Sequence, residues 1–134
     1  MTDIERSEVV IAKIIALLIE WGIQDTQMSF DELELDPEKF GSFFFPCINW
    51  LECEGIIRTD SVRRQVSGSA SGIVSRPVLT SYGFSTLGRK IQLGDVEKSL
   101  SEAIQTVNRS GENYSNAGNF TGGFLGSFIK SMVS

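Results

Sequence analysis

The sequence predicts an α+β fold, and three observations along the chain point to it. Apolar residues recur at three- and four-residue steps between residues 4 and 21, which is the period of an amphipathic helix. The triplet Asp36-Pro37-Glu38 predicts the start of a second long helix, because a capping carboxylate, a proline and an acidic residue all favour a first turn. Two β-rich runs, residues 56–66 and 73–79, then flank the polar tip of residues 67–72, which predicts a β-hairpin.

The first predicted helix covers residues 4–21. Thr2 or Asp3 is expected to cap its start, and Gly22 suits the left-handed conformation that follows a helix end. One apolar stripe runs along it, and additional apolar residues beside the stripe indicate burial on more than one side. The stripe consists of Ile4, Ile11, Ile14, Ile15 and Leu18.

A short helix is expected over residues 29–33, with Ser29 as its cap, before the long helix that starts at Asp36. Pro46 lies in the interior of that long helix and lacks an N–H, so we expect a kink near Ser42, whose carbonyl loses its partner. Gly55 should end the helix. Its inward stripe is predicted to comprise Phe40, Phe43, Phe44, Cys47, Ile48 and Leu51.

Beyond the hairpin, Thr80 is expected to cap a short helix that ends near Lys90, and a clearer helix is predicted over residues 95–109. The chain then divides into a domain of residues 1–92 and a helical extension of residues 93–109. Residues 110–119 are rich in Ser, Gly and Asn and read as a linker. Residues 120–134 read as an amphipathic segment whose glycines make it a weak helix in isolation.

Two local patterns resemble the winged-helix family, whose domains combine a three-helix core with a β-hairpin wing. The first is Leu51 followed by Gly55-Ile56-Ile57, and the second is Leu79-Thr80 followed by Gly83 and then Leu87-Gly88. The resemblance covers about residues 4–90. It implies a winged helix with a C-terminal helical extension, and it also implies that the long helix and the hairpin are the binding elements.

The sequence contains no pattern of residues that is typical of catalysis. The chain contains no histidine, which removes the commonest general base and the commonest neutral metal ligand. Cys47 and Cys53 have no zinc-site spacing, and we interpret both as reduced, buried, small hydrophobic residues. The acidic residues between 31 and 38 lack the pattern of a calcium loop. We therefore expect a protein that is not an enzyme and needs no cofactor or metal.

Reduced cysteines and the lack of a recognisable signal peptide favour a cytoplasmic location. The aliphatic run of residues 9–19 contains Lys13 and is too short to span a bilayer.

The charge is unevenly distributed, and this leads to a DNA-binding hypothesis. The net charge is −5, yet residues 55–90 hold six basic residues and only one acidic residue. Arginines around a hairpin tip suit contacts with phosphate, and Lys39 and Asn49 suit the groove-facing side of the long helix. However, Glu38 and Glu52 on that same side would be repelled by a duplex. The candidate phosphate contacts are Arg58, Arg63, Arg64 and Arg76.

The second hypothesis is protein–protein interaction, and we prefer it to DNA binding. Consecutive phenylalanines differ by about 100° around a helix, so Phe43, Phe44 and Phe45 cannot all point inward. We select Phe43 and Phe45 as interface candidates, together with Phe124, Phe128 and Ile129 of the terminal segment. That segment needs a surface to fold against: its own domain, a second copy in a homodimer, another protein or, least favoured, a membrane. The expected role is a small cytoplasmic adaptor or regulator, with a DNA-binding regulator as the alternative.

Overall fold

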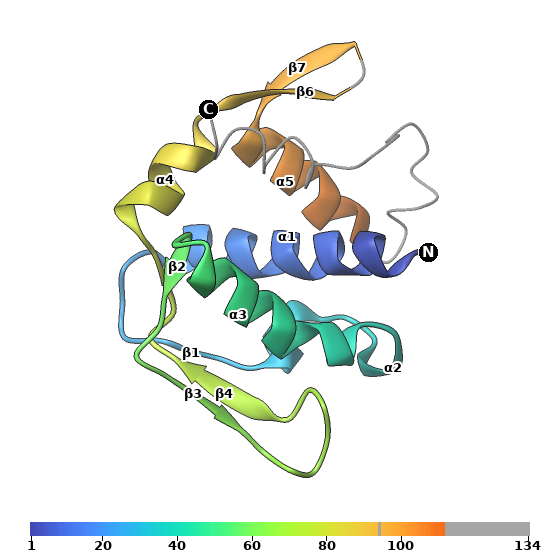
Figure 1. Ribbon diagram of the computed structural model, residues 1–134, viewed down its shortest axis with the longest axis vertical. Coiled ribbons are helices and arrows are strands. Elements are labelled where there is room, and N and C mark those ends of the chain that lie inside the picture. The colour runs from blue at the N-terminus through green and yellow to red at the C-terminus, as the bar shows by residue number, and fades with distance from the viewer. Residues whose placement is uncertain (94, 112–134) are drawn as a thin grey trace.

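The computed structural model describes residues 1–93 and 95–111, and it confirms an α+β fold (Figure 1). Helices pack around a central helix α1 (Asp3–Trp21), with α5 on one side and α3 on the other (Figure 1). The strands of the described residues form small antiparallel sheets at the periphery. The predictions for residues 112–134, which include Phe124, Phe128 and Ile129, concern residues outside the described part of the chain.

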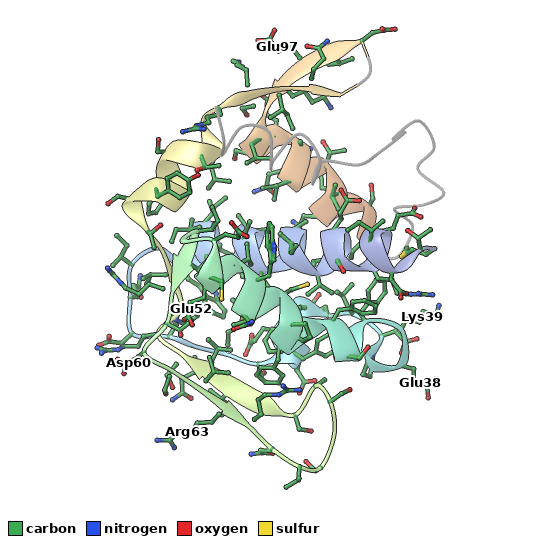
Figure 2. The ribbon with its side chains drawn as sticks, in the orientation of Figure 1. Glu38, Lys39, Glu52, Asp60, Arg63 and Glu97 are labelled. Atoms are coloured by element: carbon green, nitrogen blue, oxygen red, sulfur yellow. The ribbon has the colours of Figure 1, made fainter. Side chains whose placement is uncertain are left out.

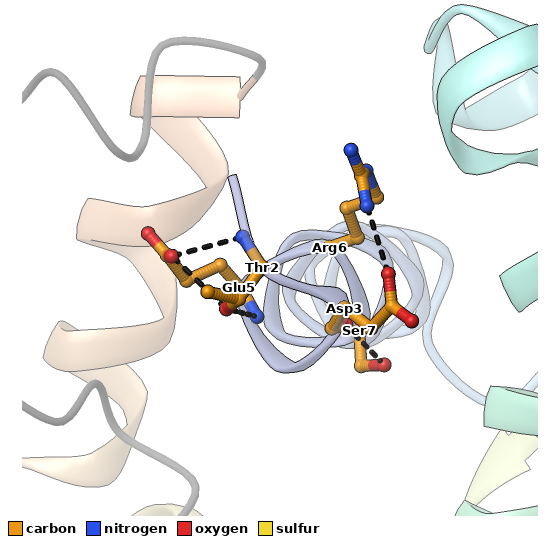
Figure 3. Close-up of polar contacts among 5 residues, drawn as sticks. All are labelled: Thr2, Asp3, Glu5, Arg6 and Ser7. Atoms are coloured by element: carbon orange, nitrogen blue, oxygen red, sulfur yellow. Dashed lines mark hydrogen bonds and ion pairs between the residues drawn. The ribbon is translucent and has the colours of Figure 1, made fainter.

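A capping box fixes the start of α1, as the sequence predicted for Thr2 (Figure 3). The Thr2 hydroxyl accepts a hydrogen bond from the Glu5 N–H at 3.2 Å, and the Glu5 carboxylate accepts one from the Thr2 N–H at 3.1 Å. Arg6 pairs with Asp3 one turn away at 2.8 Å. At the other end Gly22 adopts φ +70° and closes the helix on the Leu18 carbonyl.

The predicted kink before Pro46 is confirmed, and it divides the long helix into three pieces. These are α2 (Pro37–Phe40), the 3₁₀ turn η2 (Gly41–Phe43) and α3 (Phe44–Cys53). Because α3 restarts at Phe44, Pro46 falls in a first turn, where the missing N–H leaves no hydrogen bond broken. Asp36 caps α2 through the Glu38 N–H at 3.0 Å, as predicted.

Gly55 ends α3 through a Schellman motif that also directs the chain into the hairpin. Gly55 adopts φ +78° and donates its N–H to the Glu52 carbonyl, while the Ile56 N–H reaches the Leu51 carbonyl at 2.9 Å. The predicted hairpin follows and is confirmed as two paired sections. They are β2 (Ile57–Arg58) with β5 (Val78–Leu79), and β3 (Ser61–Arg64) with β4 (Gly72–Ser75).

One strand that the sequence did not suggest completes the larger sheet. Strand β1 (Gln27–Met28) pairs with β4, which gives the order β1-β4-β3. Between β1 and α2 lies the 3₁₀ helix η1 (Phe30–Leu33), where the short second helix was predicted. Ser29 stands at the cap position, but its side chain makes no capping hydrogen bond. We refer to β3, β4 and the tip between them, residues 61–75, as the distal hairpin.

The prediction of one helix over residues 95–109 is wrong in its first turn. Residues 90–99 form a hairpin of β6 (Lys90–Leu93) and β7 (Val96–Ser99), and only then does α5 (Leu100–Ser110) begin. Val96 is in helical register with Leu100, but pairing with β6 places it in a strand and leaves it exposed. The expected domain boundary at residue 92 therefore falls inside β6. The short helix α4 (Ser81–Leu87) is capped by Thr80, as expected.

The core forms on both sides of α1, against α5 and against α3, and its buried residues extend to η1 and β4. Within it Phe44 packs edge-on against Phe30, with ring centroids 5.9 Å apart. Two expectations about burial are wrong. Ile4 is 57% exposed in the first turn of α1, and Cys53 is exposed at the end of α3.

Candidate interaction surface

The outer side of α2 and α3 is acidic and polar, as the sequence predicted. Glu38, Lys39, Ser42, Asn49 and Glu52 are all exposed. Figure 2 places Glu38 and Lys39 at one end of this helical run and Glu52 at the other. The Glu52 carboxylate accepts a hydrogen bond from the Thr59 hydroxyl, and the Asn49 amide oxygen accepts one from the Cys53 thiol at 3.8 Å. Among these five residues, Lys39 is the one cation beside two carboxylates, and the Asn49 amide oxygen has a thiol neighbour.

Phe45 was predicted to be an accessible interface residue, but its side chain is covered. Its side chain is 3% exposed and lies beneath the distal hairpin, where Gly72 and Arg64 cover it. A Cβ at position 72 would approach the Phe45 ring to 2.7 Å and the Arg63 carbonyl oxygen to 2.2 Å, so only glycine permits this contact. Phe43 is half-buried and packs against the edge of the core, which leaves part of its ring accessible.

The four arginine candidates differ in what they contact. Arg58 and Arg63 are exposed, and neither makes an ion pair with any residue in the described part of the chain. Arg63 pairs across the hairpin with exposed Ile73 and points away from the body (Figure 2). The guanidinium of Arg64 lies 5.0 Å from the centre of the Phe45 ring, in a cation–π contact. Two of the four are therefore free for an external ligand.

Arg76 is the arginine most constrained by its surroundings. Its guanidinium pairs with Asp60 at 3.1 Å and with Asp25 at 3.4 Å, and these carboxylates raise the pKa of Arg76. The three side chains border an open hollow of about 440 Å³ at the base of the hairpin, whose other lining residues include Ile23, Arg58 and Val78. The sequence did not reveal this cluster, because Asp25 and Arg76 are 51 positions apart.

Exposed aromatic side chains on α4 were also missed. Tyr82 is 38% exposed and Phe84 is 46% exposed, while Gly83 and Leu87 are buried. The four-residue spacing of Gly83 and Leu87 was the available signal, because it places both on one side of the helix and turns Phe84 outward. Phe84 is therefore a second accessible phenyl ring, on a different element from Phe43.

Two observations on residues 1–93 and 95–111 concern metal binding and thiol chemistry. Those residues hold no group of three or more potential metal-ligating side chains. Burial raises the pKa of Cys47 to about 12, so this thiol is protonated and unreactive at neutral pH. Across the same residues, no helix has the length and apolar character needed to cross a membrane.

The comparisons with known proteins add no relative. The chain matches no protein-family model, no curated protein and no solved structure.

Proposed function

We propose that this chain is a non-enzymatic winged-helix module, a small adaptor or regulator that assembles with protein through hydrophobic surface. The order of elements supports the winged-helix assignment: α1, β1, η1, the broken helix α2–α3, and then the paired strands β2 to β5. In such a module the long helix and the hairpin present the binding surface. Fold alone does not choose between DNA and protein, so the choice depends on the side chains.

The observation that carries the proposal is the acidic outer side of α2–α3. Glu38 and Lys39 are exposed at one end of it and Glu52 is exposed at the other (Figure 2). Helices that read the major groove bring arginine or lysine to the bases, and carboxylates there are repelled by the phosphates. A protein partner carries no such penalty.

Accessible apolar side chains supply the surface that a protein partner requires. Phe84 and Tyr82 are exposed on α4, Phe43 is half-exposed, and Ile23 is 73% exposed beside the hollow. Large exposed aromatic residues are enriched where protein interfaces form. Phe43 on η2 and Phe84 on α4 are two separate candidate contacts, and Phe124, Phe128 and Ile129 of the terminal segment remain candidates.

The test is purification of the tagged full chain from its native host after nuclease treatment, with the Phe84→Ser variant beside it. We expect a protein partner, or a second copy of the chain, to co-purify with the wild type and to be lost with Phe84→Ser. Ile4→Ser is the matched control, because Ile4 is also exposed but lies at the start of α1. Recovery that disappears on nuclease treatment would contradict the proposal.

Arg58 and Arg63 favour a second candidate function, DNA binding through the hairpin. Both guanidinium groups are exposed and make no ion pair within the described residues. Fluorescence anisotropy with random duplex DNA tests it: affinity should fall as salt rises, and Arg58→Ala/Arg63→Ala should reduce the slope of log K against log salt by about 2. Absence of binding at about 50 mM salt would exclude this function, because phosphate contacts are strongest at low salt.

A further inference from the structure

We infer that Arg76 is a latch that holds strand β1 against β4 and thereby sets the position of the distal hairpin on the helical body. The residue lies at the base of the hairpin, directly after β4 and before Pro77. Its backbone and its side chain both contact the loop that follows α1, and its side chain also contacts the bend at Asp60. This inference concerns the hairpin itself and does not depend on which partner the protein binds.

The backbone of Arg76 is strained. Its φ is +48°, a left-handed conformation that side-chain-bearing residues rarely adopt. The following proline restricts the position further, because the residue before a proline favours extended conformations. Such strain persists only where surrounding contacts enforce it, and it is a feature of functional and switching sites.

Three contacts enforce the conformation of Arg76. Its N–H donates to the Thr26 carbonyl at 2.8 Å, which extends the β1–β4 pairing by one hydrogen bond. Its guanidinium bridges Asp25, in the loop before β1, and Asp60, in the bend between β2 and β3. One residue thus joins both strands of the hairpin to the loop that follows α1.

The hairpin is interrupted at the position of this latch. β2 pairs with β5 in one sheet and β3 pairs with β4 in another, and the change occurs at residues 59–60 and 76–77. Pro77 has no N–H and cannot donate a hydrogen bond between the strands at this point. The Asp60 N–H donates a hydrogen bond to the Ser75 carbonyl at 2.9 Å. β1 is only two residues long, so few backbone hydrogen bonds hold the distal hairpin in place.

The latch is adjustable because its ion pairs are open to solvent. The side chains of Arg76, Asp25 and Asp60 are 55%, 87% and 57% exposed. Exposed pairs are weak and are screened by salt, so high ionic strength weakens the latch while the backbone strain remains. An anionic group that competes for the guanidinium would have the same effect. The distal hairpin, with Arg63 and Arg64, then becomes free to adjust to a ligand.

The test is NMR of the full chain, with amide exchange and residual dipolar couplings measured for β1, β3 and β4. Asp25→Asn/Asp60→Asn removes the carboxylates and leaves the backbone of residue 76 unchanged. Arg76→Gly removes the guanidinium and relieves the strain. Arg58→Ala is the matched control, because Arg58 borders the same hollow without an ion pair in the described residues.

We expect Asp25→Asn/Asp60→Asn and Arg76→Gly to speed exchange of the residue 76 and Asp60 amides by roughly two- to tenfold, the range that two exposed ion pairs allow. The couplings of residues 61–75 should change relative to those of α1. Salt at about 0.5 M should reproduce these effects in the wild type and add little in the variants. Unchanged exchange and couplings in Asp25→Asn/Asp60→Asn, or equal changes in Arg58→Ala, would overturn the inference.

Discussion

The helical body and the distal hairpin are held together by different forces. In the body, Ile14, Phe44 and Ile104 are fully buried, and their apolar contacts support one another. In the distal hairpin, Val62 and Ile73 are 40% and 37% exposed, while Val74 is buried in the core and Ala70 of the tip packs against it. The hairpin depends instead on ladder hydrogen bonds, the contact of Gly72 with Phe45, and Arg76. Substitutions in the body should therefore alter stability, whereas substitutions in the hairpin should alter position and binding.

The largest effect that tests this contrast is expected for Phe44→Ala. Phe44 is 0% exposed, and truncating a buried phenylalanine leaves a cavity that the surrounding helices fill incompletely. We expect the free energy of unfolding to fall by about 3–5 kcal/mol, measured by urea denaturation. Phe84→Ala, at a ring that is 46% exposed, is the matched control and should cost about 0.5 kcal/mol or less. Equal losses in the two variants would break the contrast.

Gly83→Ala probes the junction between body and hairpin. A Cβ at Gly83 would lie 2.2 Å from the Ile56 carbonyl oxygen, at the point where α3 passes into the hairpin. We expect a loss of about 1–3 kcal/mol in urea denaturation, although alanine is normally the better helix former. Gly88→Ala is the control, because its nearest neighbour would be 3.7 Å away. A stabilised Gly83→Ala variant would show that α4 is not packed closely on Ile56.

The burial of Cys47 in the body predicts a loss of stability at alkaline pH. The pKa of this thiol rises from its ordinary value of 9.0 to about 12 in the folded chain. Between these values the unfolded chain loses the proton and the folded chain keeps it. The folded state should therefore lose about 1.4 kcal/mol per pH unit as the pH rises from 9 towards 12.

The measurement is the free energy of unfolding of the wild type and of Cys47→Ala, each obtained by denaturation at several pH values. Taking the difference between the two cancels the contribution of other groups that titrate at alkaline pH. Above pH 9 this difference should decrease by about 1.4 kcal/mol per pH unit. A difference independent of pH would mean that Cys47 is not buried. Exposed Cys53 offers the control, since Cys53→Ala should leave the slope unchanged.

The smallest effect is expected at the tip of the distal hairpin. Val66 is fully exposed, and it lies in the tip between β3 and β4. Val66→Ser should change the free energy of unfolding by less than about 0.5 kcal/mol. Urea denaturation beside Phe44→Ala checks this directly. A loss above about 1 kcal/mol would show that the Val66 side chain packs on another part of the molecule.

Features that depend on neighbouring residues could be predicted from the sequence, whereas features that depend on distant contacts could not. Thr2, Asp36 and Thr80 were each predicted as helix caps, and each makes the capping hydrogen bond. The exposed side of α2–α3 was also predicted, because helical periodicity alone determines which residues share a face. Val96 was placed in a helix because its spacing to Leu100 fits either structure, and the pairing of β6 with β7 decided between them.

Local chemistry in the sequence thus determined the helix caps, the break before Pro46, the end of α3 at Gly55 and the pairing of the hairpin, because each depends on residues close together in the chain. Only the tertiary structure decided that Phe45 is covered and that Arg76 is held by Asp25 and Asp60. Both outcomes depend on where the distal hairpin lies against the body. Contacts between separate segments of the chain leave no periodic signal in a single sequence, so packing alone establishes them.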